Sequence, residues 1–366
     1  MSTSPIRRET TVADVAAVAK VSKAQAARAL GGYGAVSSDV RSRVLKVAEQ
    51  LGYHPNMLAR SMNTGRSHTI GVVVGDIQNP YFSLAMRAIS DTAQPAGYDV
   101  LLINTGEDVK AEQEAVRVLQ DKRVDGYIIA PVLSDDNAHL RAVVDSGRPL
   151  VLLDRAVDGL EVDVIATASE QASFEAAQLL LEQGHERIAY ISTLKARSDR
   201  YGSEKTLGST PVAQRLGGMR RAFKEAGKEF PASLVRLNAG TDESIHEIVQ
   251  ELLAPPFGAT AIMASDSVIA LSALEEIANA GLTIPADLSF VMFDDLPWTR
   301  LLTPPLTVVS QPVYELGVAV ATTLIHRMRG EQFSAEFDFH AQLIRRGSVA
   351  APPHAETIIK RNSVSV

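Results

Sequence analysis

Residues 11–30 read TVADVAAVAKVSKAQAARAL, and this stretch decides the fold of the N-terminal part of the chain. Apolar residues recur at helical spacing over 12–19, and a break at Lys20 precedes a second helical pattern over 22–30. A third amphipathic pattern covers 39–51. Three short helices with a tight turn between the first two predict a helix-turn-helix head.

Charge is distributed unevenly along the chain of 366 residues. Residues 1–68 contain ten Lys or Arg and four Asp or Glu, a formal charge of +6, whereas the remainder carries −13. At roughly 150 residues per domain, the length predicts two or three domains. A small basic head on a large acidic body predicts that the head binds a polyanion.

The composition excludes several classes of protein. The chain has no cysteine, which excludes disulfides, thiol catalysis, iron–sulfur clusters and cysteine-based zinc sites. It has no apolar run of about 18 residues, and its first residues, MSTSPIRRETT, lack the apolar stretch of a secretory signal. We therefore expect a cytoplasmic protein with no membrane segment and no cofactor.

The second helix carries three long polar side chains, Lys23, Gln25 and Arg28, among small apolar residues. Small residues let a helix lie deep in a major groove, where long side chains reach base edges and phosphates. Taken alone, the same pattern fits an alanine-rich helix with a solvated polar face, because helix-turn-helix patterns are common by chance. The residues that follow favour the first interpretation.

Residues 36–62 read VSSDVRSRVLKVAEQLGYHPNMLARSM. Together with VADVAAVAKVS and ARAL before it, this stretch resembles the LacI/GalR family of bacterial transcription regulators, and the match continues along nearly the whole chain. The resemblance implies a hinge helix over 56–63 that enters the DNA minor groove. The residues that it assigns to DNA contact are Thr11, Ser22, Lys23, Ala24, Gln25, Arg28, Tyr53, Asn56, Ala59, Arg60 and Met62.

The head departs from the family pattern at a few positions. Met62 stands where the family has a leucine that wedges into a base step, and its flexible thioether chain suits the same task. Lys20 stands where the turn usually has glycine, which costs about 1 kcal/mol if the backbone needs a positive φ. Gln25 and Ala27 replace the usual Thr and Ser, so some phosphate contacts are expected to change.

From residue 69 onward, short buried strands alternate with amphipathic helices. Apolar runs form two series, at 69–74, 98–104, 126–130 and 150–153, and then at 188–191, 234–237, 259–264 and 288–293. Repeated strand–helix units predict parallel sheets with helices on both faces, in two similar lobes. The resemblance implies an α/β, two-lobed, periplasmic-binding-protein-like (type I) effector domain with a ligand cleft between the lobes.

The expected domains follow from these patterns and from the resemblance. They are a helix-turn-helix domain over 10–54, a hinge helix and linker over 55–66, an effector-binding and dimerisation domain over 69–350, and a flexible tail over 351–366. The family's helix near 312–329 would return to the first lobe. The first lobe is therefore expected over 69–166 and 297–330, and the second over 167–294 and 331–350.

Residues directly after the strands are the candidates for a ligand site, because open parallel sheets bind ligands beyond the carboxyl ends of their strands. Carboxylates follow several strands, as in Asp154-Arg155 and Asp294-Asp295. Carboxylates that accept from vicinal hydroxyls, with a guanidinium and an aromatic face, suit a polyhydroxylated ligand. Combined with the family match, the predicted effector site is Asn79, Phe82, Asp154, Arg155, Arg215, Ser265, Asp266, Asp294 and Trp298.

Some of these residues have a structural alternative. Asp266 is well placed to cap the helix that follows it, and Trp298 fits a core or interface position equally well. His185 lies in the family's GH-x-x-I motif and is interpreted as structural. The segment 193–214 is longer than the family leads us to expect. Its cations suit a sugar acid or sugar phosphate, although a solvated surface loop is the favoured interpretation.

An enzyme is disfavoured. Asp294 and Asp295 are adjacent, so on a strand end they point to opposite sides, which is poor for an acid and a base that act on one atom. The sequence also lacks a GxGxxG motif after a strand and the GxxxxGK[ST], GxSxG and HExxH motifs. The sequence predicts a homodimeric repressor that binds a palindromic double-stranded operator and is controlled by a carbohydrate, sugar acid or sugar phosphate. The alternative is a ligand-binding protein or metabolic enzyme without operator function.

Overall fold

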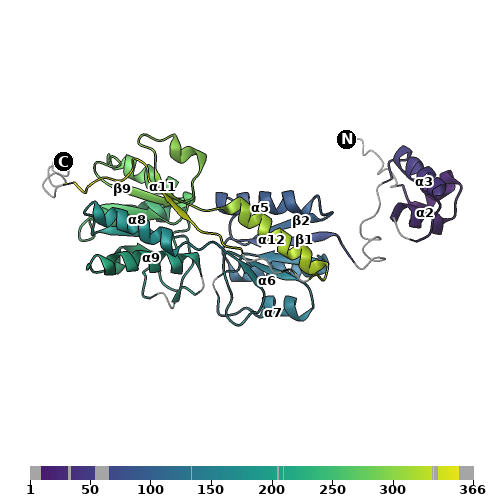
Figure 1. The fold of residues 1–366 in the computed structure, drawn as a ribbon, viewed down its shortest axis with the longest axis horizontal. Helices are drawn as coiled ribbons and strands as arrows, with labels where there is room; N and C mark the ends of the chain where they lie inside the picture. The colour runs from purple at the N-terminus through teal and green to yellow at the C-terminus, as the bar shows by residue number, and fades with distance from the viewer. Residues whose placement is uncertain are drawn as a thin grey trace, which may run out of the picture. The chain divides into compact units, whose positions relative to one another are not determined.

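The computed structural model describes residues 10–31, 34–53, 66–132, 134–203, 206–208, 210–331, 333 and 337–353. The chain divides between His68 and Thr69 into two compact units, a head and a body (Figure 1). Of the hinge helix and linker expected over 55–66, only Arg66 is described, and the tail expected over 351–366 is described only as far as Pro353.

Within residues 10–31 and 34–53, the head has three helices, α1 (Val12–Ala19), α2 (Lys23–Gly31) and α3 (Ser38–Gln50). They surround a small apolar core that includes Val15, Ala26 and Val44. Between α1 and α2, Lys20 has φ 57° and ψ 46°. This is the left-handed region, so the backbone needs the positive φ that glycine adopts more easily.

The first lobe of the body is a five-stranded parallel sheet in the order β2-β1-β3-β4-β5. Its strands are β1 (Thr69–Val74), β2 (Asp99–Asn104), β3 (Gly126–Ile129), β4 (Leu150–Leu153) and β5 (Asp163–Ile165). One face packs against α5 (Pro80–Ala93) and α12 (Val313–Met328), and the other against α6 (Val109–Asp121) and α7 (Ala138–Asp145). Helices α5 and α12 touch closely because Gly317 has no side chain: a Cβ there would lie 2.6 Å from the carbonyl oxygen of Ala85.

The second lobe is a six-stranded sheet in the order β11-β10-β9-β8-β6-β7, in which β11 alone runs antiparallel to its neighbour. Its strands are β6 (Ile188–Ile191), β7 (Val235–Arg236), β8 (Ala261–Ala264), β9 (Ser289–Phe293), β10 (Thr307–Ser310) and β11 (Gln342–Ile344). Helices α8 (Glu170–Glu182) and α9 (Pro211–Glu225) cover one face, and α10 (Asp242–Leu253) and α11 (Ser267–Asn279) the other. Two short 3-10 helices, η2 (Ala232–Leu234) and η3 (Pro297–Arg300), join these elements.

The expected boundary between the lobes at residue 297 is wrong. β10 adds to the second sheet beside β9, so the chain stays in the second lobe as far as Ser310. Only then does it return to the first lobe as α12, as the resemblance implies (Figure 1). Within the described ranges, no helix has the length and hydropathy that a membrane span requires.

Candidate functional site

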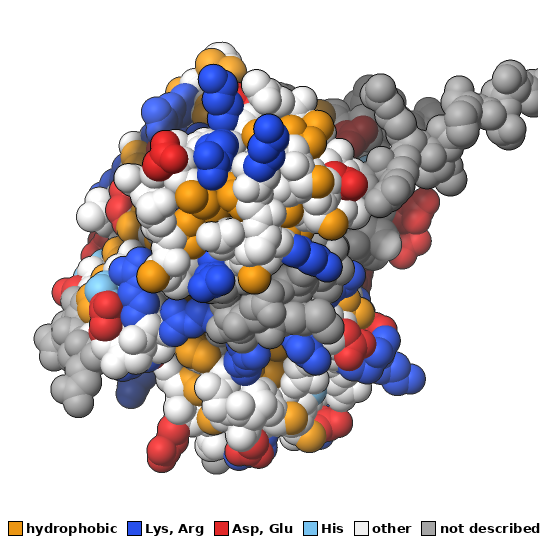
Figure 2. Space-filling model, turned by 90° about the vertical axis from the view of Figure 1, so that its right-hand side faces the viewer, with side chains coloured by type: hydrophobic (Ala, Val, Ile, Leu, Met, Phe, Trp, Pro, Cys, Tyr) orange, Lys and Arg blue, Asp and Glu red, His pale blue; other side chains and the backbone are white. Residues whose placement is uncertain are grey.

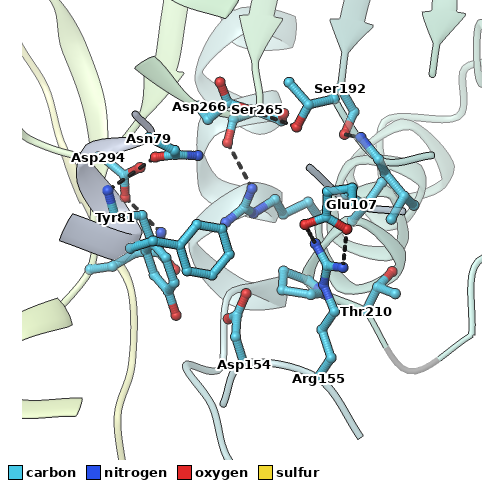
Figure 3. Close-up of a pocket in the computed structure, with 17 residues that line it drawn as sticks. Asn79, Tyr81, Glu107, Asp154, Arg155, Ser192, Thr210, Ser265, Asp266 and Asp294 are labelled. Atoms are coloured by element: carbon cyan, nitrogen blue, oxygen red, sulfur yellow. Dashed lines mark hydrogen bonds and ion pairs between the residues drawn. The ribbon is translucent and has the colours of Figure 1, made fainter. Parts of the chain in front are cut away.

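A cavity between the two lobes collects most of the residues predicted for the effector site (Figure 3). Its open space, part of which is continuous with the solvent, is about 520 Å³. Every predicted residue except Trp298 lines it. The described residues that line it are Asn79, Tyr81, Phe82, Glu107, Asp154, Arg155, Ser192, Thr193, Leu194, Thr210, Pro211, Val212, Arg215, Ser265, Asp266, Asp294 and Gln311.

Asp154 and Asp294 hold equivalent positions in the two lobes. Asp154 follows β4 and Asp294 follows β9. Each of these strands is the fourth in its sheet when the strands are counted from β2 in the first lobe and from β7 in the second. Both residues have positive φ, 70° and 77°, which aspartate tolerates better than most residues. Burial raises the pKa of Asp154, against the opposing effect of Arg155, and raises the pKa of Asp294 to about 6. Each lobe therefore presents one carboxylate to the same cavity, half-buried in Asp154 and buried in Asp294.

The N-terminus of α5 supplies an aromatic wall. Oδ1 of Asn79 accepts a hydrogen bond of 3.0 Å from the backbone N–H of Tyr81, so Asn79 caps the helix. Tyr81 and Phe82 are buried and meet edge to face, with ring centroids 5.3 Å apart. Burial and the nearby Asp154 carboxylate raise the pKa of Tyr81, so its hydroxyl stays protonated.

Arg215 is a buried cation at the start of α9. Its Nη1 donates to the carbonyl oxygen of Ser265 at 2.8 Å, and its guanidinium lies 4.0 Å from the ring centroid of Phe293. Nε of Arg215 has no hydrogen-bond partner among the described residues. Because an unpaired buried donor is costly, this arrangement leaves Arg215 able to donate to a bound molecule.

The second guanidinium of the cavity pairs with the protein through its two Nη atoms, whereas its Nε has no hydrogen-bond partner among the described residues. Nη1 and Nη2 of Arg155 donate to the Glu107 carboxylate at 2.7 and 3.0 Å, and Nη1 also donates to the carbonyl oxygen of Pro131 at 3.0 Å. Glu107 fits there because Gly75 has no side chain: a Cβ on Gly75 would lie 2.1 Å from Oε1 of Glu107. The bidentate pair holds the first-lobe wall in place.

The structural alternative for Asp266 is confirmed, although Asp266 also lines the cavity. Its Oδ1 accepts hydrogen bonds from the backbone N–H groups of Val268 and Ile269 at 3.0 and 3.1 Å and so caps α11. Its Oδ2 accepts from the hydroxyl groups of Thr193 and Ser265. Asp266 therefore orders the second-lobe wall.

The prediction that Trp298 lines the site is wrong. Trp298 lies in η3 and packs against an apolar cluster of the second lobe, because η3 runs along that lobe before β10. Asp295 points away from the cavity, as predicted for the neighbour of Asp294, and pairs with Arg300 and Arg346 at 2.7 Å each.

His185 is structural, as predicted. It is buried, with Nδ1 at 2.9 Å from the hydroxyl group of Thr260 and Nε2 at 2.9 Å from that of Ser289. Within the described ranges, no group of three or more His, Asp or Glu side chains is arranged to hold a metal ion.

The long segment after β6 is not the solvated loop that the sequence favoured. Leu194, Tyr201 and Leu207 are buried in the second lobe. Two cations of the same segment contact the first lobe. Nζ of Lys195 donates to the carbonyl oxygen of Gly106 at 2.6 Å, and Arg197 forms an ion pair with Asp135. Gly106 and Asp135 belong to the first lobe, so the segment joins both lobes at the mouth of the cavity.

Sequence reasoning missed several residues of the cavity, among them Tyr81, Glu107, Ser192, Thr193 and Gln311. Ser192 and Thr193 directly follow β6, so the strand-end rule that located Asp154 also applied to them. Gln311 follows β10, a strand that the apolar pattern did not indicate. Nε2 of Gln311 donates to Oδ1 of Asp294 at 2.7 Å.

In the head, several residues predicted to contact DNA also cap helices. The Thr11 side chain caps α1. Ser22 and Gln25 cap the start of α2 reciprocally: each backbone N–H donates to the other's side-chain oxygen at 3.1 Å. Gln25 therefore has its amide oxygen engaged while its NH2 group remains a donor.

The remaining predicted DNA contacts divide by exposure. Lys23 and Ala24 are exposed on α2, whereas Tyr53 is half-buried and packs against the core of the head. Nε of Arg28 donates to the carbonyl oxygen of Ala24 at 3.2 Å. Figure 2 shows Lys and Arg side chains interspersed with hydrophobic and acidic ones on the face that it views. The other predicted contacts, Asn56, Ala59, Arg60 and Met62, lie outside the described residues.

Family models match both units. Residues 11–56 match the model described as "Bacterial regulatory proteins, lacI family", and residues 67–342 match "Periplasmic binding proteins and sugar binding domain of LacI family". The chain belongs to the LacI family. Among its LacI-family relatives is the HTH-type transcriptional repressor CytR of Escherichia coli (strain K12), 32% identical over 94% of this chain and 97% of the relative. The ribose operon repressor of Halalkalibacterium halodurans is 34% identical over 86% and 89%.

Solved structures of LacI-family proteins are similar as well. A LacI family transcriptional regulator from Enterococcus faecium with bound ribose is 27% identical, with a TM-score of 0.64 over 77% of this chain and 99% of that one. The lac repressor dimer bound to operator and the anti-inducer ONPF is 24% identical, with a TM-score of 0.76 over 94% and 100%. Because the second structure covers 94% of this chain, it confirms the fold of the head as well as that of the body.

Proposed function

We propose that this LacI-family regulator binds a palindromic operator through its head, and that a small polyhydroxylated metabolite in the interlobe cavity controls its affinity for the operator. Membership of a family of regulatory proteins makes the chain a transcriptional regulator and not an enzyme. The observation that carries the effector half is the pair Asp154 and Asp294, one cavity-lining carboxylate from each lobe. A molecule that donates hydroxyl hydrogens to both favours one arrangement of the lobes over others.

Two comparisons support a sugar or sugar derivative as the effector. A related protein is a ribose operon repressor, and a similar regulator was solved with bound ribose. The cavity offers what a sugar ring needs: carboxylate acceptors, the Arg215 donor and an aromatic wall formed by Tyr81 and Phe82.

On the DNA side, we propose that α2 is the recognition helix. Lys23 and Ala24 are exposed at its start, and the NH2 group of Gln25 remains a donor beside them. Arg28 bonds to its own helix at 3.2 Å and can exchange that contact for a phosphate or base edge. We extend the proposal to residues 56–63, with Met62 as the side chain that wedges into a base step of the minor groove.

We propose a homodimer, because both lobes expose large apolar side chains. In the first lobe they lie on α5 and on β2, the edge strand of its sheet, and in the second on α11 and after η3. They are Leu84, Leu101, Leu102, Leu271, Leu301 and Leu302. Two heads on one dimer read two half-sites, which explains a palindromic operator. A protein with this task works where the chromosome lies, so we propose the cytoplasm as its location.

Selection of genomic fragments bound by the full chain, with and without a bacterial metabolite extract, tests the proposal. The expected result is an enriched palindrome whose recovery the extract changes. Loss of recovery with extract identifies an inducible repressor, and recovery only with extract identifies co-repression. A set of fragments without a shared palindrome in either arm contradicts operator binding.

A further inference from the structure

A second cavity, here called the side cavity, lies beside the interlobe cavity, between the first lobe and the segment that follows β6. It is partly open to the solvent, and the volume in it that water molecules could fill is about 900 Å³. Small-molecule sites occupy about 300–1,000 Å³. Pro131, Val132 and Asn137 belong to its first-lobe wall, and Ala196 and Thr206 to its second-lobe wall. The side cavity is therefore large enough for a metabolite.

Two of the described residues, Arg155 and Thr210, line both cavities and so lie between them. The protein holds each of them in place. Nη1 of Arg155 donates to Glu107 (Figure 3) and to the carbonyl oxygen of Pro131. Oγ1 of Thr210 accepts a hydrogen bond of 3.2 Å from the backbone N–H of Ala213 and caps α9. The two cavities can therefore hold separate molecules.

A buried carboxylate fixes the first-lobe wall of the side cavity. Glu112, on α6, is fully buried. Its Oε2 accepts a hydrogen bond of 2.7 Å from the backbone N–H of Val132, and its Oε1 lies 2.7 Å from Nε2 of His139 on α7. Glu112 thus ties this wall to two helices of the first lobe.

Asn238 fixes the second-lobe wall. Its Oδ1 accepts a hydrogen bond of 2.6 Å from the backbone N–H of Ala196, and its Nδ2 donates to the carbonyl oxygen of Ala196 at 3.1 Å. Leu194 and Leu207, which belong to the same segment, are buried. Both walls are therefore built by side chains that are part of the folded body.

Two buried polar atoms in the lining of the side cavity have no hydrogen-bond partner among the described residues, Oδ1 of Asn137 and Nε of Arg155. Nδ2 of Asn137 donates to the carbonyl oxygen of Ser134 at 3.0 Å, so the amide oxygen is the unpaired end. An unpaired buried donor or acceptor is costly. A bound hydroxyl or amide group, which both donates and accepts, can supply the missing partners.

The charges of the side cavity favour an uncharged molecule. Four Lys or Arg side chains and three Asp side chains line it, and Glu107, which pairs with Arg155, is the fourth acid, so the formal charge cancels. One of the ion pairs, Arg197 with Asp135, has side chains that are each 84% exposed, so water screens it strongly. Apolar side chains, among them Val132 and Val157, complete the lining.

We propose that the side cavity is a second ligand site, separate from the interlobe cavity, and that it binds an uncharged small molecule with an apolar body and a hydroxyl or amide group. The apolar body packs against Val132, Ala156 and Val157, and Asn137 accepts a hydrogen bond from the polar group. This inference goes beyond the proposed function, because it does not depend on what the interlobe cavity binds.

Retention of metabolites by the full chain tests the inference. The chain is incubated with a bacterial metabolite extract and collected on an ultrafiltration membrane, and the small molecules that denaturation releases are identified by mass spectrometry. Asp154→Ala changes the interlobe cavity, and Ala156→Phe fills the side cavity. Ala142→Phe is the matched control, because Ala142 is exposed on α7 and lies outside the described lining of both cavities.

We expect an uncharged compound that the wild type, Asp154→Ala and Ala142→Phe all retain, and that Ala156→Phe retains at least about tenfold less, because the ring occupies its place. Asn137→Leu removes the acceptor and should lower retention of the same compound by about fivefold. Thermal unfolding without extract checks that each variant folds, and Ala156→Phe decides the test if Asn137→Leu does not fold.

The other outcomes separate the inference from the proposed function. Compounds that depend on Asp154, with none that depends on Ala156, overturn the second site and leave the proposed function in place. A compound that is lost from Asp154→Ala and from Ala156→Phe alike shows that one molecule spans both cavities, which overturns a separate site. A charged compound lost only from the side-cavity variants overturns the ligand class. An uncharged one lost only from those variants, with none that depends on Asp154, supports the second site and contradicts the proposed function.

Discussion

Replacing Asp294 with Asn should stabilise the ligand-free chain at neutral pH, although Asp294 lines the effector cavity. Burial raises the pKa of Asp294 from the ordinary 3.8 to about 6, so the folded protein holds this carboxylate in its charged form at a cost. The amide oxygen of an Asn can still accept the hydrogen bond of 2.7 Å from Gln311. The substitution therefore removes a buried charge without leaving a buried donor unpaired.

The pKa shift gives the size and the sign of the effect. A shift of about two units at 1.36 kcal/mol per unit gives an upper limit of about 3 kcal/mol. Because the folded pKa is raised, the contribution of Asp294 makes the wild type lose stability as the pH rises from about 4 to about 6. Asn does not titrate, so the advantage of the variant should be absent near pH 4 and complete above pH 7.

Urea unfolding of the full chain at pH 4 and pH 8 measures this difference. Trp298 is the chain's single tryptophan and packs in the same lobe as Asp294, so its fluorescence reports unfolding there. We expect the variant to be more stable by about 1–3 kcal/mol at pH 8 and equal to the wild type at pH 4. No gain at pH 8, or the same gain at both pH values, refutes the reasoning.

The neighbouring residue supplies a control of opposite sign. Burial acts to raise the pKa of Asp295, but hydrogen bonds from Arg300 and Arg346 outweigh it and lower the pKa. Asp295→Asn should therefore destabilise the chain at pH 8, by about 2 kcal/mol, because charged hydrogen bonds are lost. This loss should shrink as the pH falls, since protonation of the wild-type carboxyl weakens the same contacts.

Three further outcomes are expected. Lys20→Gly should relieve the left-handed backbone at φ 57° and stabilise the head by about 1 kcal/mol; amide hydrogen exchange over α1–α3 in the full chain should slow about fivefold, and unchanged exchange contradicts the strain. Arg28→Ala should weaken binding to a selected operator by about 1–3 kcal/mol; equal affinity across a salt series would show that α2 is not the recognition helix. Arg197→Ala removes an ion pair whose side chains are 84% exposed, so effector affinity measured by titration should change less than about fivefold; a larger loss would show that the pair controls closure of the lobes.

Long apolar runs made most of the body predictable from sequence. β1, β4 and β6 lie where the apolar runs predict them, because each is buried along nearly its whole length. β5 and β11, of three residues each, were not located because they are short and partly exposed. Because β10 was not recognised, the predicted boundary between the lobes was placed too early: β10 still belongs to the second sheet, and the chain leaves the second lobe only after it.

The strand-end rule explains both the successes and the failures at the site. It found Asp154 and Asp294 because their strands were found. It missed Gln311 because β10 was not recognised, and Glu107 because this residue stands three positions beyond β2 and reaches the cavity only past Gly75. Trp298 has the right chemistry, but η3 directs it to an apolar cluster, which depends on packing that no local pattern reveals.

The most direct test is operator affinity measured by fluorescence anisotropy on a selected palindrome, titrated with a bacterial metabolite extract, for the wild type and for Asp154→Ala. We expect the extract to change wild-type affinity by about 5- to 150-fold, the usual range of coupling between two sites. Asp154→Ala should bind the operator as the wild type does without the extract and should not respond to it. A wild-type affinity that the extract leaves unchanged, or a full response in the variant, contradicts control of operator binding through the interlobe cavity.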